Sequence, residues 1–198
     1  MNNRKATITA AIASGILDAE TAGLLWLLVD GGLQLVVSGR PGSGRRAIRE
    51  ALFALPNRDR SAHRPRPEPK LMAAESLAEV LLELTSPPLS LTDDQVRGMG
   101  VVLIMRAVDR HGSRLVAAHY LRPVERDAAG HLQRRPPAVL AAWDERHDRL
   151  DHYAWGVTGE LAERMAMTLG DFERAQRERQ DLLAQLATDG VVEPDALH

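Results

Sequence analysis

The sequence predicts an α/β fold in which a strand–loop–helix unit precedes antiparallel hairpins and a C-terminal helix. Three observations predict it: a glycine-rich turn inside residues 33–55, two later pairs of β-rich runs with polar turns, and a charged helical stretch near the end. The chain has 198 residues, 44% apolar and 26% charged, which is enough to bury one core.

The chain divides into three predicted parts: N-terminal helices in 1–32, the glycine-loop domain in 33–160 and a helical segment in 161–198. No apolar run approaches the ~20 residues that cross a bilayer, so we expect no membrane span. The absence of cysteine fits a reducing compartment, and we expect a cytoplasmic protein. The net charge of −2 provides no global field for nucleic acid.

The first third of the chain predicts two helices, a strand and a third helix. Apolar residues recur at helical spacing through 7–30, with Asp18 as a cap between two helices and Gly31-Gly32 as the end of the second. The run 33–38 is short and contains β-branched residues, which is typical of a strand. A helix is then predicted from about Arg46 to Leu55, where Pro56 stops it.

The middle of the chain predicts a loop and two helices. Residues 56–70 contain four prolines and carry a local charge of +3 without apolar periodicity, which predicts an exposed loop. Helical spacing returns from Leu71 to Leu84, and Pro87-Pro88 follows it. Thr92 and Gln95 have the spacing of a capping box, which predicts a short helix there.

The last hundred residues predict two β-hairpins and a final helical segment. The first hairpin joins 101–108 to 114–121 and the second joins 138–143 to 149–155, each through a polar turn. From Leu161 the chain is helical again. The stretch 171–187 has a thin apolar seam formed by Phe172, Ala175, Leu182, Leu183 and Leu186. We expect this seam to pack on its own domain, with a contact to a second chain as the alternative.

The glycine-rich turn is the candidate binding site, and its residues are Gly39, Arg40, Pro41, Gly42, Ser43, Gly44, Arg45 and Arg46. Such a loop between a strand and a helix lets backbone N–H groups converge on phosphate oxygens. A P-loop also needs a lysine and then a hydroxyl that binds Mg²⁺, and Arg45 and Arg46 stand there instead. We therefore expect an anion site that binds Mg²⁺ badly or not at all, whereas an ordinary glycine turn is the alternative.

The sequence around this loop resembles the type II/type IV secretion ATPases, which are RecA-like P-loop motors. The resemblance runs over roughly 24–166. The stretch 71–81 is similar to the family's histidine box, with Ala73 in the place of the histidine, and 101–106 and 114–117 resemble its closing antiparallel strands. The resemblance implies a reduced RecA-like fold, ATP or ADP as the candidate ligand, and homo-oligomers or secretion-machinery subunits as partners.

The departures from the family concern its catalytic parts. Between the P-loop helix and the histidine-box-like stretch the family holds an acidic box and a Walker B carboxylate, whereas this chain has only residues 56–70 there. The lysine, the hydroxyl and the histidine are also replaced. We therefore expect a degenerate ATPase-like protein whose degenerate Walker A loop binds nucleotide or another anion. We expect it to have lost most or all of its ATP-hydrolysing activity and to have no catalytic residue of its own. It would then act through association with other proteins.

Two other functions stay open at this point. An active motor subunit would need a carboxylate from Asp144-Glu145, which follows an apolar strand, although the same pair also suits a hairpin turn. A nucleic-acid-binding accessory protein would have to use the basic loop from Arg58 to Lys70. The seven histidines form no short-spaced cluster with carboxylates, so we expect no metal site.

Overall fold

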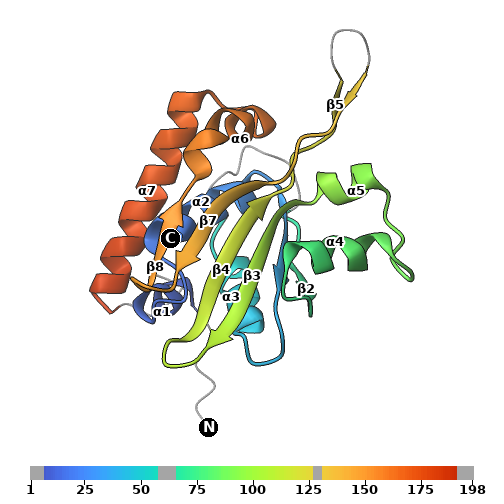
Figure 1. Ribbon diagram of the computed structural model, residues 1–198. Coiled ribbons are helices and arrows are strands. Elements are labelled where there is room, and N and C mark those ends of the chain that lie inside the picture. The colour runs from blue at the N-terminus through green and yellow to red at the C-terminus, as the bar shows by residue number, and fades with distance from the viewer. Residues whose placement is uncertain (1–6, 58–65, 127–130, 191–198) are drawn as a thin grey trace.

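The computed structural model describes residues 7–57, 66–126 and 131–190. A six-stranded mixed sheet forms its centre, with helices on both faces (Figure 1). The strands are β1 (Gln34–Ser38), β2 (Lys70–Met72), β3 (Gly100–Val108), β4 (Gly112–Tyr120), β7 (Ala138–Asp144) and β8 (Arg149–His152). They are ordered β2-β1-β3-β4-β7-β8, and β1 runs parallel to β2 and β3 whereas the remaining pairs are antiparallel.

One face of the sheet is covered by helices from both ends of the chain. These are α1 (Ile8–Ala13), α2 (Ala19–Asp30), α3 (Arg45–Phe53), α6 (Thr158–Arg164) and α7 (Leu169–Thr188), with the short 3₁₀ turn η1 (Ala154–Gly156) after β8. Their apolar side chains form one core with Leu35, Leu103 and Leu115 of the sheet. The N-terminal and C-terminal helices are therefore packed into the same core as the glycine-loop unit.

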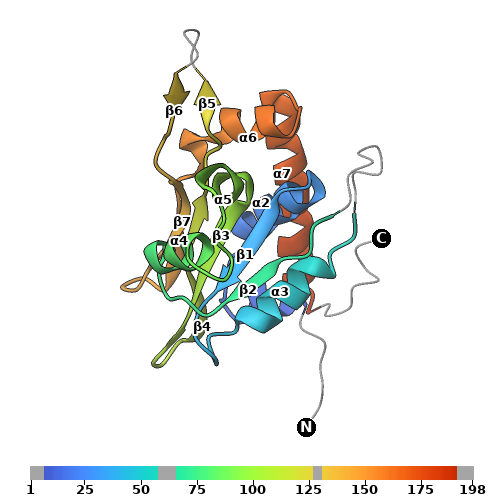
Figure 2. The ribbon, with the colours of Figure 1, turned by 90° about the vertical axis from the view of Figure 1, so that its right-hand side faces the viewer.

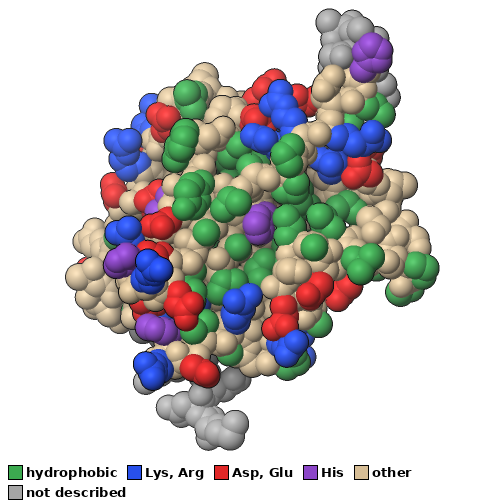
Figure 3. Space-filling model, in the orientation of Figure 1, with side chains coloured by type: hydrophobic (Ala, Val, Ile, Leu, Met, Phe, Trp, Pro, Cys, Tyr) green, Lys and Arg blue, Asp and Glu red, His purple; other side chains and the backbone are tan. Residues whose placement is uncertain are grey.

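The other face of the sheet is covered only in part. Helices α4 (Leu77–Thr85) and α5 (Asp93–Gly98) pack on Val36, Val102 and Ile104, in a second and smaller core. Figure 1 shows the neighbouring part of this face, over β4 and β7, without a helix in front of it. In the same view, apolar side chains gather at the surface (Figure 3), and Val139 of β7 is 39% exposed.

Most of the predicted elements are confirmed. The strand, glycine loop and helix follow one another as expected, and both predicted hairpins form, as β3–β4 and β7–β8. Asp18 caps α2 by accepting from the Thr21 N–H at 2.8 Å, and Thr92 and Gln95 complete a capping box on α5. A small hairpin of β5 (Glu125–Arg126) and β6 (Leu132–Gln133) was not expected.

The helix predicted from Leu71 is wrong over its first six residues. Residues 70–72 form β2 instead, because Leu71 and its neighbours pair in parallel with β1. The helix begins only at Leu77, where the Ser76 side chain accepts from the Glu79 N–H. Two consecutive apolar residues, Leu71 and Met72, show no strand or helix period of their own, so a strand partner outside the segment decides their conformation.

The loop predicted to be exposed over 56–70 is partly anchored. Residues 58–65 lie outside the described residues. Arg66, however, donates to the carbonyls of Leu52 and Leu55, and Pro69 is buried. At least one basic side chain of this segment therefore forms its hydrogen bonds within the protein.

The seam of α7 is an internal contact. Phe172 and Leu183 are fully buried, and Leu182 and Leu186 pack partly against the same core. The helix lies along α2 and α1, as Figures 1 and 2 show. The expectation that this seam packs on its own domain is therefore confirmed.

Candidate functional site

The glycine loop leaves β1 at Ser38 and enters α3 at Arg45, as a phosphate-binding loop requires. Gly39, Gly42 and Gly44 all have positive φ, at 149°, 90° and 83°. At two of them the space is also taken: a Cβ on Gly39 would lie 2.3 Å from the Met105 carbonyl oxygen, and one on Gly44 would lie 2.7 Å from Ser113 Oγ. The loop conformation thus depends on glycine at these two positions.

The first turn of α3 has free donors. Gly44 is the N-cap residue and has no side chain to cap the helix. Within the described residues, no group accepts from the backbone N–H of Gly44, Arg45 or Arg46. A cavity of about 450 Å³ lies against this turn and is lined by Pro41, Gly42, Gly44, Arg45, Arg46 and Ala47. The cavity therefore combines unpaired amides with the positive end of the helix dipole.

The two arginines that replace the P-loop lysine and hydroxyl have different roles. Arg45 Nη1 folds back and donates to the carbonyl of Gly39 at 2.6 Å and to that of Met72, so it bridges the loop and β2. Arg46 is exposed and, among the described residues, makes no ion pair or side-chain hydrogen bond. Arg46 is thus the cation that remains available to a ligand, whereas Arg45 stabilises the loop.

The side chains of Arg40 and Ser43 do not line this cavity. Arg40 forms an ion pair with Glu75, with 2.6 Å between its Nη2 and the Glu75 Oε2. Ser43 is 2% exposed, and its hydroxyl has no partner in the described structure. Among the described residues no acid lines the cavity, and Arg46 stands where a hydroxyl would ligate the metal. The residues present therefore fit an anion but do not fit Mg²⁺.

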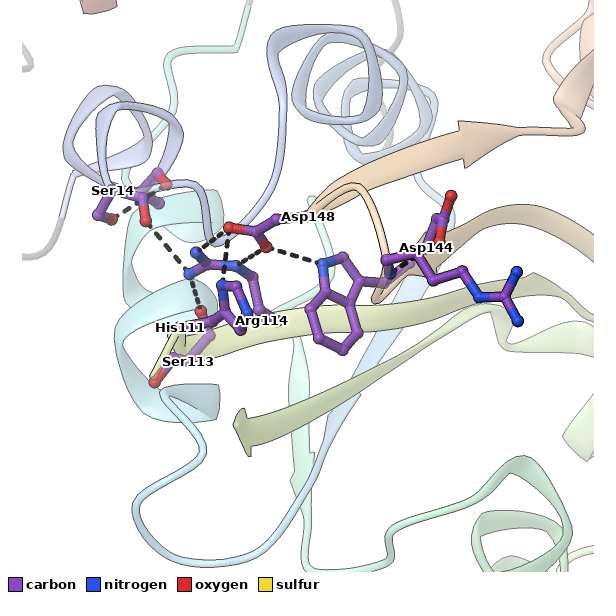
Figure 4. Close-up of polar contacts among 9 residues, drawn as sticks. Ser14, His111, Ser113, Arg114, Asp144 and Asp148 are labelled. Atoms are coloured by element: carbon purple, nitrogen blue, oxygen red, sulfur yellow. Dashed lines mark hydrogen bonds and ion pairs between the residues drawn. The ribbon is translucent and has the colours of Figure 1, made fainter. Parts of the chain in front are cut away.

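The β3–β4 hairpin forms a wall beside the loop, and a polar cluster fixes it in place (Figure 4). Ser113, which contacts Gly44, accepts through its carbonyl from Arg114 Nη1 at 2.9 Å. Asp148 of the β7–β8 turn accepts from Arg114 Nε at 2.8 Å and from Nη2 at 2.9 Å. Trp143 Nε1 donates to the same carboxylate at 3.0 Å, and His111 Nδ1 lies 3.0 Å from it. The hydrogen bond from Arg114 is the main cause that holds the pKa of Asp148 well below its usual range.

Asp144 is the last residue of β7 and Glu145 begins the β7–β8 turn, and both lie away from the loop strand. Strands β3 and β4 separate β7 from β1. Asp144 accepts from the Arg146 N–H at 2.9 Å and pairs with His147, both in its own turn. The turn interpretation is therefore the one that the structure supports. The acid next to the loop is Glu75, which the pair with Arg40 already engages.

Sequence reasoning missed the role of the histidine-box-like stretch. Residues 73–76 follow β2 at the same end of the sheet as the loop, and Ser38 Oγ donates to the Ala74 carbonyl at 2.6 Å. The contacts of Arg45 with Met72 were also missed, because the two residues are 27 positions apart. The only sequence signal for them was the pair of apolar residues Leu71 and Met72, a few positions before the helix cap Ser76.

No protein-family model matches the chain, and no curated protein matches it either. Within the described residues, no helix is long and apolar enough to cross a bilayer. The same residues contain no group of three or more His, Asp or Glu side chains arranged to hold a metal ion.

Proposed function

We propose that the chain is a degenerate P-loop protein that binds a nucleotide or another phosphate-bearing anion at Gly39–Arg46 and acts by associating with other proteins. The observation that carries the anion site is the uncapped first turn of α3, which presents unpaired amides and Arg46 to a cavity without acids. Such an arrangement favours a bound anion electrostatically and through hydrogen bonds. The similarity to the secretion ATPases adds homo-oligomers or secretion-machinery subunits as the class of partners.

Hydrolysis is lost or very weak in this proposal. Phosphoryl transfer by P-loop enzymes depends on Mg²⁺ and on a lysine that neutralises the developing charge. Here Arg45 is engaged by two carbonyls, and no carboxylate from the described part of the chain lines the cavity. The active-motor alternative has no support from Asp144, which bonds within its own turn. The nucleic-acid alternative has no support from Arg66, which donates to the carbonyls of Leu52 in α3 and of Leu55.

Isothermal titration tests the anion site. We expect ATP, ADP and pyrophosphate to bind the full chain, and we expect added Mg²⁺ to leave the affinity unchanged or to lower it. Arg46→Ala should weaken binding about tenfold, because it removes a charge-assisted contact. Arg146→Ala is the matched control, since Arg146 is an exposed arginine in the β7–β8 turn. Absence of binding by all three anions would overturn the proposal.

Light scattering and chemical crosslinking in the native host test the association. A chain that self-associates or crosslinks reproducibly to one set of proteins supports this part of the proposal. A monomer that crosslinks to nothing refutes it, and the anion site then stands alone as a ligand sensor.

A further inference from the structure

Strand β2 is an outer edge of the sheet, with β1 as its neighbour on one side only. The Gly39 N–H donates to the Met72 carbonyl at 3.3 Å, so the peptide groups of Met72 face β1. Because successive residues of a strand direct their peptide groups to opposite sides, the N–H and C=O of Leu71 face away from β1. Figure 2 looks onto this edge and shows β2 between α3 and α4. The edge thus presents one donor and one acceptor to an incoming chain.

An apolar groove runs along the same edge. Its cavity has a volume of about 620 Å³, and its apolar lining consists of Pro69, Leu71, Met72, Leu84, Leu89 and Leu91. Leu89 is 52% exposed although it lines the groove. Large apolar side chains that surround a concave surface and remain exposed mark an interaction site.

The charges at the groove select the kind of partner. Arg49 donates to the Pro69 carbonyl at 3.1 Å and pairs with Glu68, so both of those charges are compensated. Lys70 is exposed, lines the groove and has no ion-pair partner among the described residues. The groove therefore has one uncompensated positive charge beside an apolar surface, which an acidic group with apolar neighbours complements.

We propose that this edge groove binds an extended peptide segment of a partner protein, which adds as a strand beside β2 and carries apolar residues together with an acidic one. Main-chain hydrogen bonds to Leu71 align the segment, an apolar side chain enters the groove against Leu89, and a carboxylate meets Lys70. Strand addition of this kind combines backbone pairing with side-chain pockets. The proposal rests on the association half of the proposed function and names its surface.

A second copy of the chain fits this edge less well. Pairing of two β2 strands about a twofold axis would bring two uncompensated Lys70 side chains to the same junction. Like charges and short edge strands are features that oppose edge-to-edge pairing of identical sheets. The strand is only three residues long and follows a proline.

Selection from a random dodecapeptide phage library on the full chain tests the proposal. Counter-selection uses Leu89→Asp, which places a charge in the groove. We expect the recovered peptides to share alternating apolar residues and an Asp or Glu. A synthetic consensus peptide should bind the wild type in fluorescence anisotropy and bind Leu89→Asp and Lys70→Glu at least about tenfold more weakly. Methylation of the backbone nitrogen that pairs with Leu71 should weaken binding to a similar degree.

Leu82→Asp is the matched control, because Leu82 is 65% exposed on α4 and does not line the groove. It should leave the peptide affinity unchanged. No enrichment over the Leu89→Asp counter-selection, or a peptide affinity that backbone methylation does not change, overturns the proposal. Self-association that Leu89→Asp abolishes overturns it as well, because a second copy is then the occupant. The anion titration is repeated on Leu89→Asp, so that loss of the loop site is distinguished from loss of the groove.

Discussion

Asp30 is a carboxylate buried at the end of α2, with its side chain 1% exposed. Its Oδ2 accepts from Arg179 Nη2 at 2.9 Å, and Arg66 Nη2 lies 4.0 Å from its Oδ1. The Arg179 guanidinium also lies over the Trp26 ring, 5.4 Å from its centroid. Burial lowers the pKa of Arg66, and the charge of Asp30 opposes that shift. These contacts tie α7 and residues 66–69 to α2.

Removal of Arg179 from its pair with Asp30 should destabilise the protein strongly, because the buried negative charge of Asp30 then loses a positive partner. We expect Arg179→Ala to lower the free energy of unfolding by about 3 kcal/mol, as measured by urea denaturation. Arg174→Ala, on the same helix in an exposed pair with Asp171, should leave it nearly unchanged, because solvent screens such a pair. Equal losses for the two variants would show that the buried pair is not an anchor.

Gly42 and Gly44 allow the two constraints on the loop to be separated. Both have positive φ, but a Cβ on Gly42 meets nothing within 4 Å, whereas one on Gly44 meets Ser113. Gly42→Ala should cost about 1 kcal/mol of stability, the cost of a left-handed non-glycine residue. Gly44→Ala should cost more and should weaken pyrophosphate binding. The additional Ser113→Gly substitution should bring the stability of Gly44→Ala back to that of Gly42→Ala, as thermal unfolding would measure.

At the scale of elements, His152 links the end of β8 to the start of α2. Its Nε2 lies 2.8 Å from Asp18 Oδ2, and its Nδ1 lies 3.5 Å from Glu20 Oε1. The hydrogen bond with Asp18 raises the pKa of His152 despite the opposing effect of burial, and the charges of Asp18, Glu20 and Asp151 add to it. Burial opposes a low pKa for Asp18, but its hydrogen bonds with His152 and Thr21 lower the pKa overall.

This contact gives stability a defined pH dependence. The pKa of His152 is raised when the protein folds, so its contribution is complete below its ordinary value of 6.5 and is lost as the pH rises through the folded-state value. The stability difference between wild type and His152→Gln should therefore be larger at about pH 5.5 than at about pH 9. Urea denaturation at both pH values measures it. A difference that does not change with pH would contradict the assignment.

His119 provides a control of opposite sign. Burial lowers the pKa of His119, so its neutral form is favoured in the folded protein and stability is lost as the pH falls. At acidic pH, His119→Gln should accordingly raise the free energy of unfolding relative to the wild type, whereas His152→Gln should lower it. Parallel pH profiles for the two variants would contradict both assignments.

Elements with a strong local period were predictable, and those that depend on distant contacts were not. The glycine loop and both hairpins have their signals within a single short stretch of sequence each, so the sequence alone predicted them. Strand β2 could not be predicted, because its conformation depends on pairing with β1 more than 30 positions earlier. The same holds for the Asp30–Arg179 pair, which joins residues 149 positions apart.

The candidate site was predictable as a backbone but not as a set of side chains. Glycine spacing located the loop, and its positive φ angles follow from it. The different roles of Arg45 and Arg46 depend on where the Gly39 and Met72 carbonyls lie, which no local pattern encodes. The apolar seam of α7 was ambiguous for a similar reason, since its partner could be a helix of either the same chain or another one.

At the scale of the whole molecule, the fold places a glycine loop before α3, and no carboxylate of the described residues lines the cavity beside it. We expect no Mg²⁺-dependent phosphate release from ATP above the buffer background in a colorimetric assay. The double variant Arg45→Lys/Arg46→Thr should bind Mg²⁺–ATP more tightly than the wild type while its turnover stays at background, because the activating carboxylate is still absent. Mg²⁺-dependent turnover that Asp144→Asn abolishes would establish the motor alternative instead.

Arg45 Nη1 donates to the carbonyl of Gly39 in the loop and to that of Met72 in β2, so one side chain connects the loop to the edge strand of the sheet. If occupancy of one end changes the energy of this bridge, thermodynamic linkage requires the other end to respond by the same factor. Saturation of β2 with peptide should then change the pyrophosphate affinity by a certain factor. Saturation of the loop with pyrophosphate should change the peptide affinity by the same factor. In Arg45→Ala both factors should fall to one, which would make this arginine the coupling element of a two-ligand switch.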